Sequence, residues 1–133
     1  MIKLFDAGTK LNFIDDRNAF VGFNFEQDCC ERFGWRVLVD GRCDVYAQGD
    51  SRGSTGKLEM EDWVFDTDTP PRKDLTGILP DINLNDGGAV AFRIKEEFDP
   101  DEKGWLVLYN SHNGYYSHGW ECGKLNIEKE GRI

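Results

Sequence analysis

Four cysteines and two histidines are the residues of this 133-residue chain best suited to chemistry. Thiolates and imidazoles can act as nucleophile and base, or can bind zinc. Two of the thiols, Cys29 and Cys30, are adjacent. Neighbouring side chains point to opposite faces of a strand and diverge by about 100° on a helix, so these two thiols do not chelate one metal in regular structure. The sequence has no Cys-x-x-Cys spacing. We therefore expect no zinc knuckle, no thioredoxin-type motif and no cofactor.

The two histidines lie on either side of Asn113-Gly114, the strongest hairpin signal in the chain. A two-residue turn at that position predicts that Tyr109 pairs with His118 and that His112 faces the opposite way. A metal site using both imidazoles would need a bulge in the hairpin. The favoured interpretation of His118 is a hydrogen-bonded structural histidine. A pair of one histidine with one of the adjacent thiols is the alternative.

Acidic stretches suggest calcium sites, so two of them were compared with the EF-hand pattern. The segment that starts at Asp81 has Asp86 in the glycine position and Phe92 where the bidentate glutamate belongs. The segment that starts at Asp99 fails at Lys103. Both are interpreted as solvated turns, and no metal is predicted.

The elements that must position these residues are strands. Val21, Phe23 and Phe25 alternate with polar or small residues, and Trp35, Val37 and Val39 do the same. The polar cluster at 15–18 predicts a hairpin turn, and Gly41 ends a strand. Residues 48–57 are expected to form a loop and residues 67–73 an extended connection, and the following stretch up to Gly88 is expected to hold either a brief helix or only loops. The expected strands are 2–5, 11–14, 19–25, 35–40, 61–66, 90–98, 105–110 and 115–122.

The last third of the chain, residues 89–122, predicts a three-stranded antiparallel meander. Its first strand places Val90, Phe92, Ile94 and Phe98 on the core face. In the other two strands the predicted core face is Trp105, Val107, Tyr109, Ser111, Tyr116, His118, Trp120 and Cys122.

Length and composition set the fold class. A chain of 133 residues suits one domain, here 1–133. Aromatic residues make up 13% of the sequence, which favours half-buried pleated surfaces. We expect a mainly β domain, or an α+β domain with little helix, built on an antiparallel sheet.

The chain is acidic, with 16 basic and 25 acidic residues and a net charge of -9. This balance argues against nucleic-acid binding and against anionic membranes, and it would attract a basic protein partner. No apolar run is long enough for a membrane helix or a secretory signal. Four cysteines are too few for a disulfide scaffold. We expect reduced, buried structural thiols in a cytoplasmic protein.

Two segments carry a resemblance: Gln27-Asp28-Cys29-Cys30-Glu31 after an early strand, and Ser111-His112-Asn113-Gly114-Tyr115-Tyr116-Ser117 at the expected last hairpin. Together they resemble a family of small uncharacterised bacterial and phage domains. The resemblance implies a compact β-rich domain and makes the two motifs candidates for one shared site, without implying an activity. The candidate binding residues are Gln27, Asp28, Cys29, Cys30, Glu31, His112, Asn113, Tyr115, Tyr116 and His118.

Two functions are consistent with these residues. The first is an accessory protein that binds a basic protein partner, as an inhibitor or immunity protein does. The alternative is a small enzyme or metal-binding domain that uses Cys29 or Cys30 with His112 or His118. No catalytic residue is assigned, and the oligomeric state is open.

Overall fold

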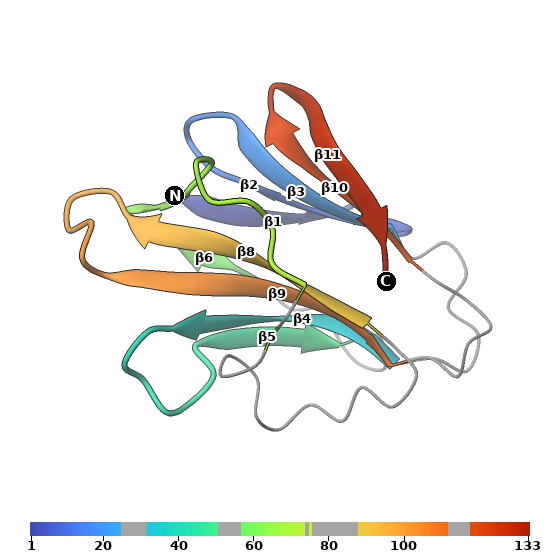
Figure 1. The fold of residues 1–133 in the computed structure, drawn as a ribbon, viewed down its shortest axis with the longest axis horizontal. Coiled ribbons are helices and arrows are strands. Elements are labelled where there is room, and N and C mark those ends of the chain that lie inside the picture. The colour runs from blue at the N-terminus through green and yellow to red at the C-terminus, as the bar shows by residue number, and fades with distance from the viewer. Residues whose placement is uncertain (25–31, 51–56, 74, 76–87, 112–117) are drawn as a thin grey trace.

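A computed structural model describes residues 1–24, 32–50, 57–73, 75, 88–111 and 118–133. In this part of the chain the fold is all-β, and two antiparallel sheets pack face to face (Figure 1). The prediction of a mainly β, antiparallel fold is confirmed. Residues 1–24, 32–50, 57–73, 75, 88–111 and 118–133 include no helix long and apolar enough to cross a membrane.

The first sheet has six strands, in the order β11-β10-β3-β2-β1-β6. Their bounds are β1 Ile2–Asp6, β2 Lys10–Ile14, β3 Ala19–Asn24, β6 Glu59–Met60, β10 Gly119–Lys124 and β11 Asn126–Arg132. The second sheet has five strands, in the order β5-β4-β9-β8-β7. Their bounds are β4 Arg32–Val39, β5 Ala47–Asp50, β7 Trp63–Phe65, β8 Gly88–Glu96 and β9 Lys103–Ser111.

The core lies between the sheets and follows from strand alternation. Leu11, Phe13, Val21 and Phe23 point inward from β2 and β3 and are fully buried. The ring of Phe13 meets that of Trp35 on the opposite sheet edge-on, at 5.4 Å between centroids, a favourable geometry for aromatic pairs. The alternation predicted for the second and third strands and for β4 is thus confirmed.

The turn between β2 and β3 is held by Asp15, which is buried although it is charged. One carboxylate oxygen accepts hydrogen bonds from the backbone N–H groups of Arg17 at 2.8 Å and Ala19 at 2.9 Å. The other accepts from the N–H of Phe65 on β7 at 2.9 Å. Asn18 takes the left-handed conformation, with φ 64°, which asparagine tolerates well. The predicted turn is confirmed, and it also ties the two sheets together.

The predicted meander at 89–122 is only partly correct. β8 and β9 form the expected hairpin, with Val90 opposite Leu108. The third strand does not join them, because β9 is already paired on both edges: Tyr109 lies opposite Gly34 on β4 and Ala89 on β8. β10 instead crosses to the other sheet and pairs with β3 and β11. The predicted pairing of Tyr109 with His118 is therefore wrong.

The predicted faces of β9 are also wrong. Leu106, Leu108 and Asn110 point into the core, whereas Trp105, Val107 and Tyr109 belong to a second apolar cluster with Ala89 and Ala91. A central strand covered on both faces is apolar on both, so alternation does not identify its inner side. The predicted core face of β8 is confirmed for Val90, Phe92 and Ile94, but Phe98 lies beyond the strand and is 74% exposed.

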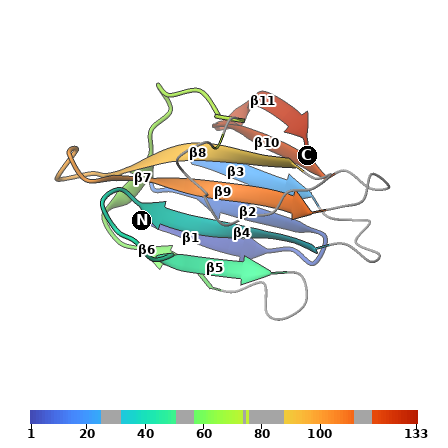
Figure 2. The same ribbon diagram turned by 60° about the horizontal axis from the view of Figure 1, so that its bottom comes forward.

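Three strands were not expected from the sequence, and one of them is the short β6 at Glu59–Met60. Residues 47–50 form β5, which pairs with β4, although 48–57 was expected to be a loop. β11 was not predicted at all. Its sequence, NIEKEGR, has almost no buried residue, because it is an edge strand that extends beyond the facing sheet, as Figure 2 shows. A polar, charged edge strand is common and has no hydrophobic period.

Candidate functional site

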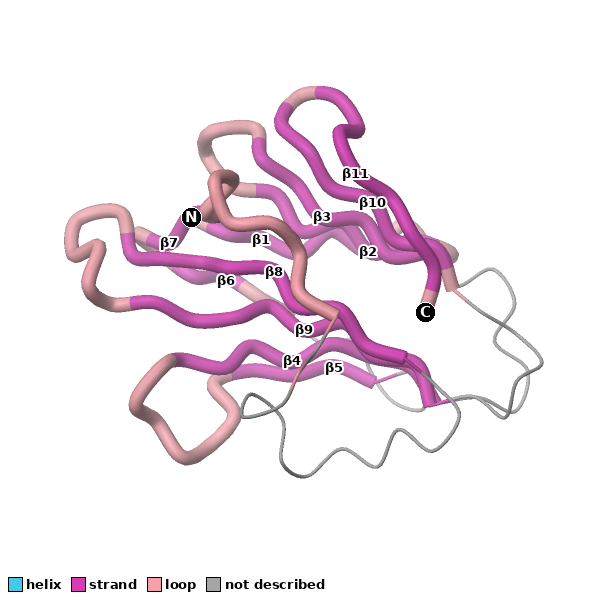
Figure 3. The backbone as a smooth tube through the Cα atoms, in the orientation of Figure 1, coloured by secondary structure: helices cyan, strands magenta, loops and turns pink. Residues whose placement is uncertain are grey.

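Most of the sequence-predicted site lies outside the described residues. This applies to Gln27, Asp28, Cys29, Cys30, Glu31, His112, Asn113, Tyr115 and Tyr116. The described strands on either side of the two motifs show where the motifs begin and end. Arg32 is paired with Ser111, and Asn24 ends β3 at the same end of the sandwich where β10 begins (Figure 3).

His118, the one described residue of the predicted site, is part of the core and only 2% exposed. Its ring packs against Phe23 at 5.8 Å and Phe33 at 4.9 Å between centroids. Its backbone N–H donates to the carbonyl of Ile133 at 2.7 Å, and the N–H of Ile133 donates back at 2.9 Å. These contacts favour the structural interpretation of His118, although its predicted neighbour Tyr109 was wrong.

The two described cysteines, Cys43 and Cys122, are both free thiols. Cys43 is exposed on the β4–β5 turn, so its interpretation as a buried structural thiol is wrong. Cys122 is half-buried on β10. Burial raises the pKa of the Cys122 thiol, and Glu128 raises it further, while Lys129 lowers it. A thiol with a raised pKa is a weak nucleophile at neutral pH.

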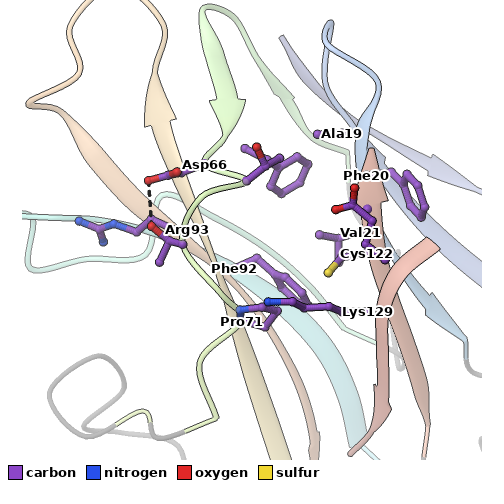
Figure 4. Close-up of a pocket in the computed structure, with 14 residues that line it drawn as sticks. Ala19, Phe20, Val21, Asp66, Pro71, Phe92, Arg93, Cys122 and Lys129 are labelled. Carbon is purple, nitrogen blue, oxygen red and sulfur yellow. Dashed lines mark hydrogen bonds between the residues drawn. The ribbon is translucent and has the colours of Figure 1, made fainter. Parts of the chain in front are cut away.

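A small pocket beside Cys122 opens between the sheets, with a volume of about 60 Å³. Figure 4 shows Phe92, Cys122 and Lys129 pointing into it from β8, β10 and β11. Pro71 closes it from the 66–71 segment. The volume holds a few water molecules and is well below that of an ordinary ligand site. This pocket therefore does not indicate a function.

An acidic cluster occurs where β8 turns into β9. Carboxylate oxygens of Glu96, Asp99 and Glu102 lie within 4.8 Å of one another. Partial desolvation, a hydrogen bond that protonated Glu96 donates to Glu102, and the charges of Glu102, Asp99 and Asp62 raise the pKa of Glu96. Sequence reasoning treats these residues as ordinary turn residues, because the cluster forms only across the hairpin. Carboxylates on a hairpin turn are common without a metal, so this cluster does not indicate one.

The connections at one end of the sandwich are strongly acidic. Five of them lie there, toward the left of Figure 1 except for the β10–β11 turn at its top: 15–18, 40–46, 61–62, 97–102 and 125. They contain ten acidic and two basic residues, a formal charge of -8 against -9 for the whole chain. The rest of the chain contains 15 acidic and 14 basic residues. The net charge is therefore concentrated at this end, which we call the acidic end.

Hydrogen bonds and ion pairs join the turns of the acidic end. Arg17 pairs with Glu97 at 3.1 Å, and Arg42 pairs with Glu102 at 3.8 Å. The N–H of Glu97 donates to the carbonyl of Asp62 at 2.6 Å, and the N–H of Leu125 donates to that of Asn18 at 3.0 Å. The acidic end is thus one connected surface rather than five independent loops.

Exposed apolar side chains also gather on the acidic end. Phe98 and Leu125 are each 74% exposed, and Tyr46 is 46% exposed. Sequence reasoning missed this surface because the strand connectivity decides which turns share an end. The sequence did offer one signal: the net charge summed over alternate connections between successive strands, because these connections lie at the same end of the sandwich.

No family model, no curated protein and no solved structure matches this chain, so its function is inferred from its own residues.

Proposed function

We propose that this protein is a binding module that engages a basic protein partner through its acidic end, in the manner of an inhibitor or immunity protein. The observation that carries the proposal is the concentration of nearly all the net charge on five connected turns. A surface of one sign attracts a partner of the opposite sign and speeds their association by about tenfold to a thousandfold.

Charge alone does not give a tight complex, because exposed ion pairs contribute little to the free energy of binding. Binding energy comes mainly from a few large side chains that become buried, with Tyr, Trp and Arg prominent among them. Phe98 is suited to this role, since it is exposed at the tip of the β8–β9 hairpin with acidic residues on both sides. We therefore propose Phe98 as the central apolar anchor, with Tyr46 as a second aromatic contact.

The turns of the acidic end should also lose little conformational entropy on binding. The hairpin that carries Phe98 is closed by hydrogen bonds from the N–H of Glu96 to the carbonyl of Glu102 at 2.9 Å, and from the N–H of Glu102 to that of Asp99 at 3.0 Å. Preorganised loops lose less conformational entropy when they bind. The surface supports recognition of a folded partner or of a basic segment with an apolar residue.

Selection of random peptides displayed on phage tests this proposal and does not require the partner to be identified first. We expect peptides rich in Lys and Arg that also carry an apolar residue. The charge-reversal pair Asp44→Lys and Asp101→Lys alters two exposed turn residues of the acidic end and should weaken binding by about tenfold or more. Phe98→Ala should weaken it without a change in the salt dependence, because the ring carries no charge.

The matched control reverses the same number of charges on β11, with Glu128→Lys and Glu130→Lys. These residues are exposed and lie outside the acidic end. The proposal is wrong if the selected peptides show no excess of basic residues, or if the two double variants weaken binding equally.

We also propose a cytoplasmic location, which the free thiols of Cys43 and Cys122 support.

A further inference from the structure

The outer face of the six-stranded sheet is hollowed at the end away from the acidic end. The hollow has a volume of about 400 Å³ and lies over β2, β3, β10 and β11, in the size range of small-molecule sites. Strand register explains it. Gly22 stands beside Glu121, and Gly119 stands beside Arg132, on the outward side of the sheet. Gly119 leaves its position on this face empty, whereas the side chains of Lys10 and Glu121 lie over Gly22.

The backbone does not require these two glycines. Gly8 and Gly41 are the glycines with positive φ among the described residues, and neither lies in the hollow. A Cβ atom on Gly119 would have no neighbour closer than 3.9 Å. A Cβ atom on Gly22 would touch the flexible side chains of Lys10 and Glu121. Glycine weakens a strand and often marks the close approach of a ligand.

The rim of the hollow alternates hydrogen-bond donors and acceptors. Glu121 and Glu130 lie directly opposite each other on β10 and β11, a like-charge arrangement that does not favour the sheet. Lys10 forms an ion pair with Glu121, and Arg132 and Asn24 complete the rim. The two carboxylates and two cations balance, so the hollow has no net charge.

The hollow is confined to the outer face of the sheet. Trp120 lies between Gly119 and Glu121 on β10, and its side chain points to the opposite face, where its ring packs on Phe92 in the core at 5.5 Å between centroids. The side chains available to a ligand in the hollow are therefore those of the rim.

We propose that this hollow binds a neutral polyhydroxylated ligand, a sugar unit of an oligosaccharide. Each hydroxyl group can donate to the carboxylate of Glu121 or Glu130 and accept from Lys10, Arg132 or Asn24. Because the rim has no net charge, it does not favour a free anion or a free cation over a neutral ligand. Purely apolar ligands would gain no hydrogen bond from this rim.

The test is a two-dimensional NMR titration of the full chain with maltotriose, cellotriose, chitotriose and mannotriose. We expect saturable shifts of the amide signals of Gly22 and Gly119 with at least one trisaccharide. Gly119→Thr should weaken binding by about tenfold or more, because it fills the hollow where the structure has free space. Glu130→Gln should also weaken it by about tenfold, since a charge-assisted hydrogen bond is lost.

Asn12→Thr is the control, since Asn12 is next to Gly22 on the same outer face and does not line the hollow. It should change binding by less than about twofold. The acidic-end variant Asp44→Lys with Asp101→Lys should bind the trisaccharide normally, which separates this inference from the protein-binding proposal. The inference is overturned if none of the four trisaccharides shifts these signals, or if folded Gly119→Thr binds as well as the native chain.

Discussion

The strongest stability prediction concerns Asp15, whose carboxylate joins the β2–β3 turn to β7. Asp15→Ala removes three hydrogen bonds at 2.8 to 2.9 Å. Two of the donors, the N–H groups of Ala19 and Phe65, are in buried bonds. A buried donor left without an acceptor costs about 1–3 kcal/mol. We therefore expect Asp15→Ala to lower the free energy of unfolding by about 4 kcal/mol, a large part of the stability of an ordinary domain.

Asp15→Asn separates the two roles of this side chain. An amide keeps one oxygen, so it can serve either the turn or the N–H of Phe65, but not both. We expect a loss of about 2 kcal/mol, roughly half that of the alanine variant. Asp16→Ala is the control, because Asp16 is exposed and pairs with the terminal amine. Exposed pairs contribute little, so this loss should be below about 0.5 kcal/mol.

Urea unfolding followed by tryptophan fluorescence measures these differences, with linear extrapolation to water. The slope of the unfolding free energy against urea concentration should be the same for the native chain and the three variants, since the surface exposed on unfolding hardly changes. A loss below about 1 kcal/mol for Asp15→Ala would refute the reasoning, as would equal losses for Asp15→Ala and Asp16→Ala.

Three further predictions follow from local geometry. Iodoacetamide should modify exposed Cys43 at least about tenfold faster than Cys122, as peptide mass mapping would show; equal native rates would contradict the burial of Cys122. The raised pKa of Glu96 means that its contribution to stability is present in acid and is lost as the pH rises through that pKa. Glu102→Gln should therefore raise the melting temperature more at pH 7 than at pH 4, and a larger gain in acid would oppose this. Gly34→Ala should cost about 1–3 kcal/mol, because its Cβ would lie 2.3 Å from the carbonyl oxygen of Gly49, whereas Gly119→Ala should be neutral or stabilising in the same urea assay.

The sequence determined the local elements well wherever a strand has one buried face. β2, β3 and β4 alternate with a period of two, and the polar residues at 15–18 form the turn that their side chains favour. The same reasoning failed for β9, which is apolar on both faces, and for β11, which is polar on both. Alternation carries information only when the two faces of a strand have different surroundings.

The sequence by itself also determined the total charge of -9, and with it the expectation of a basic partner. Only the tertiary structure decided where that charge lies, because pairing between strands distant in sequence brings five short turns to one end. It likewise moved β10 away from β9, since each edge of a strand can accept one partner. The hollow has the same origin: Gly22 and Glu121 are far apart in the chain and become neighbours only when β3 pairs with β10.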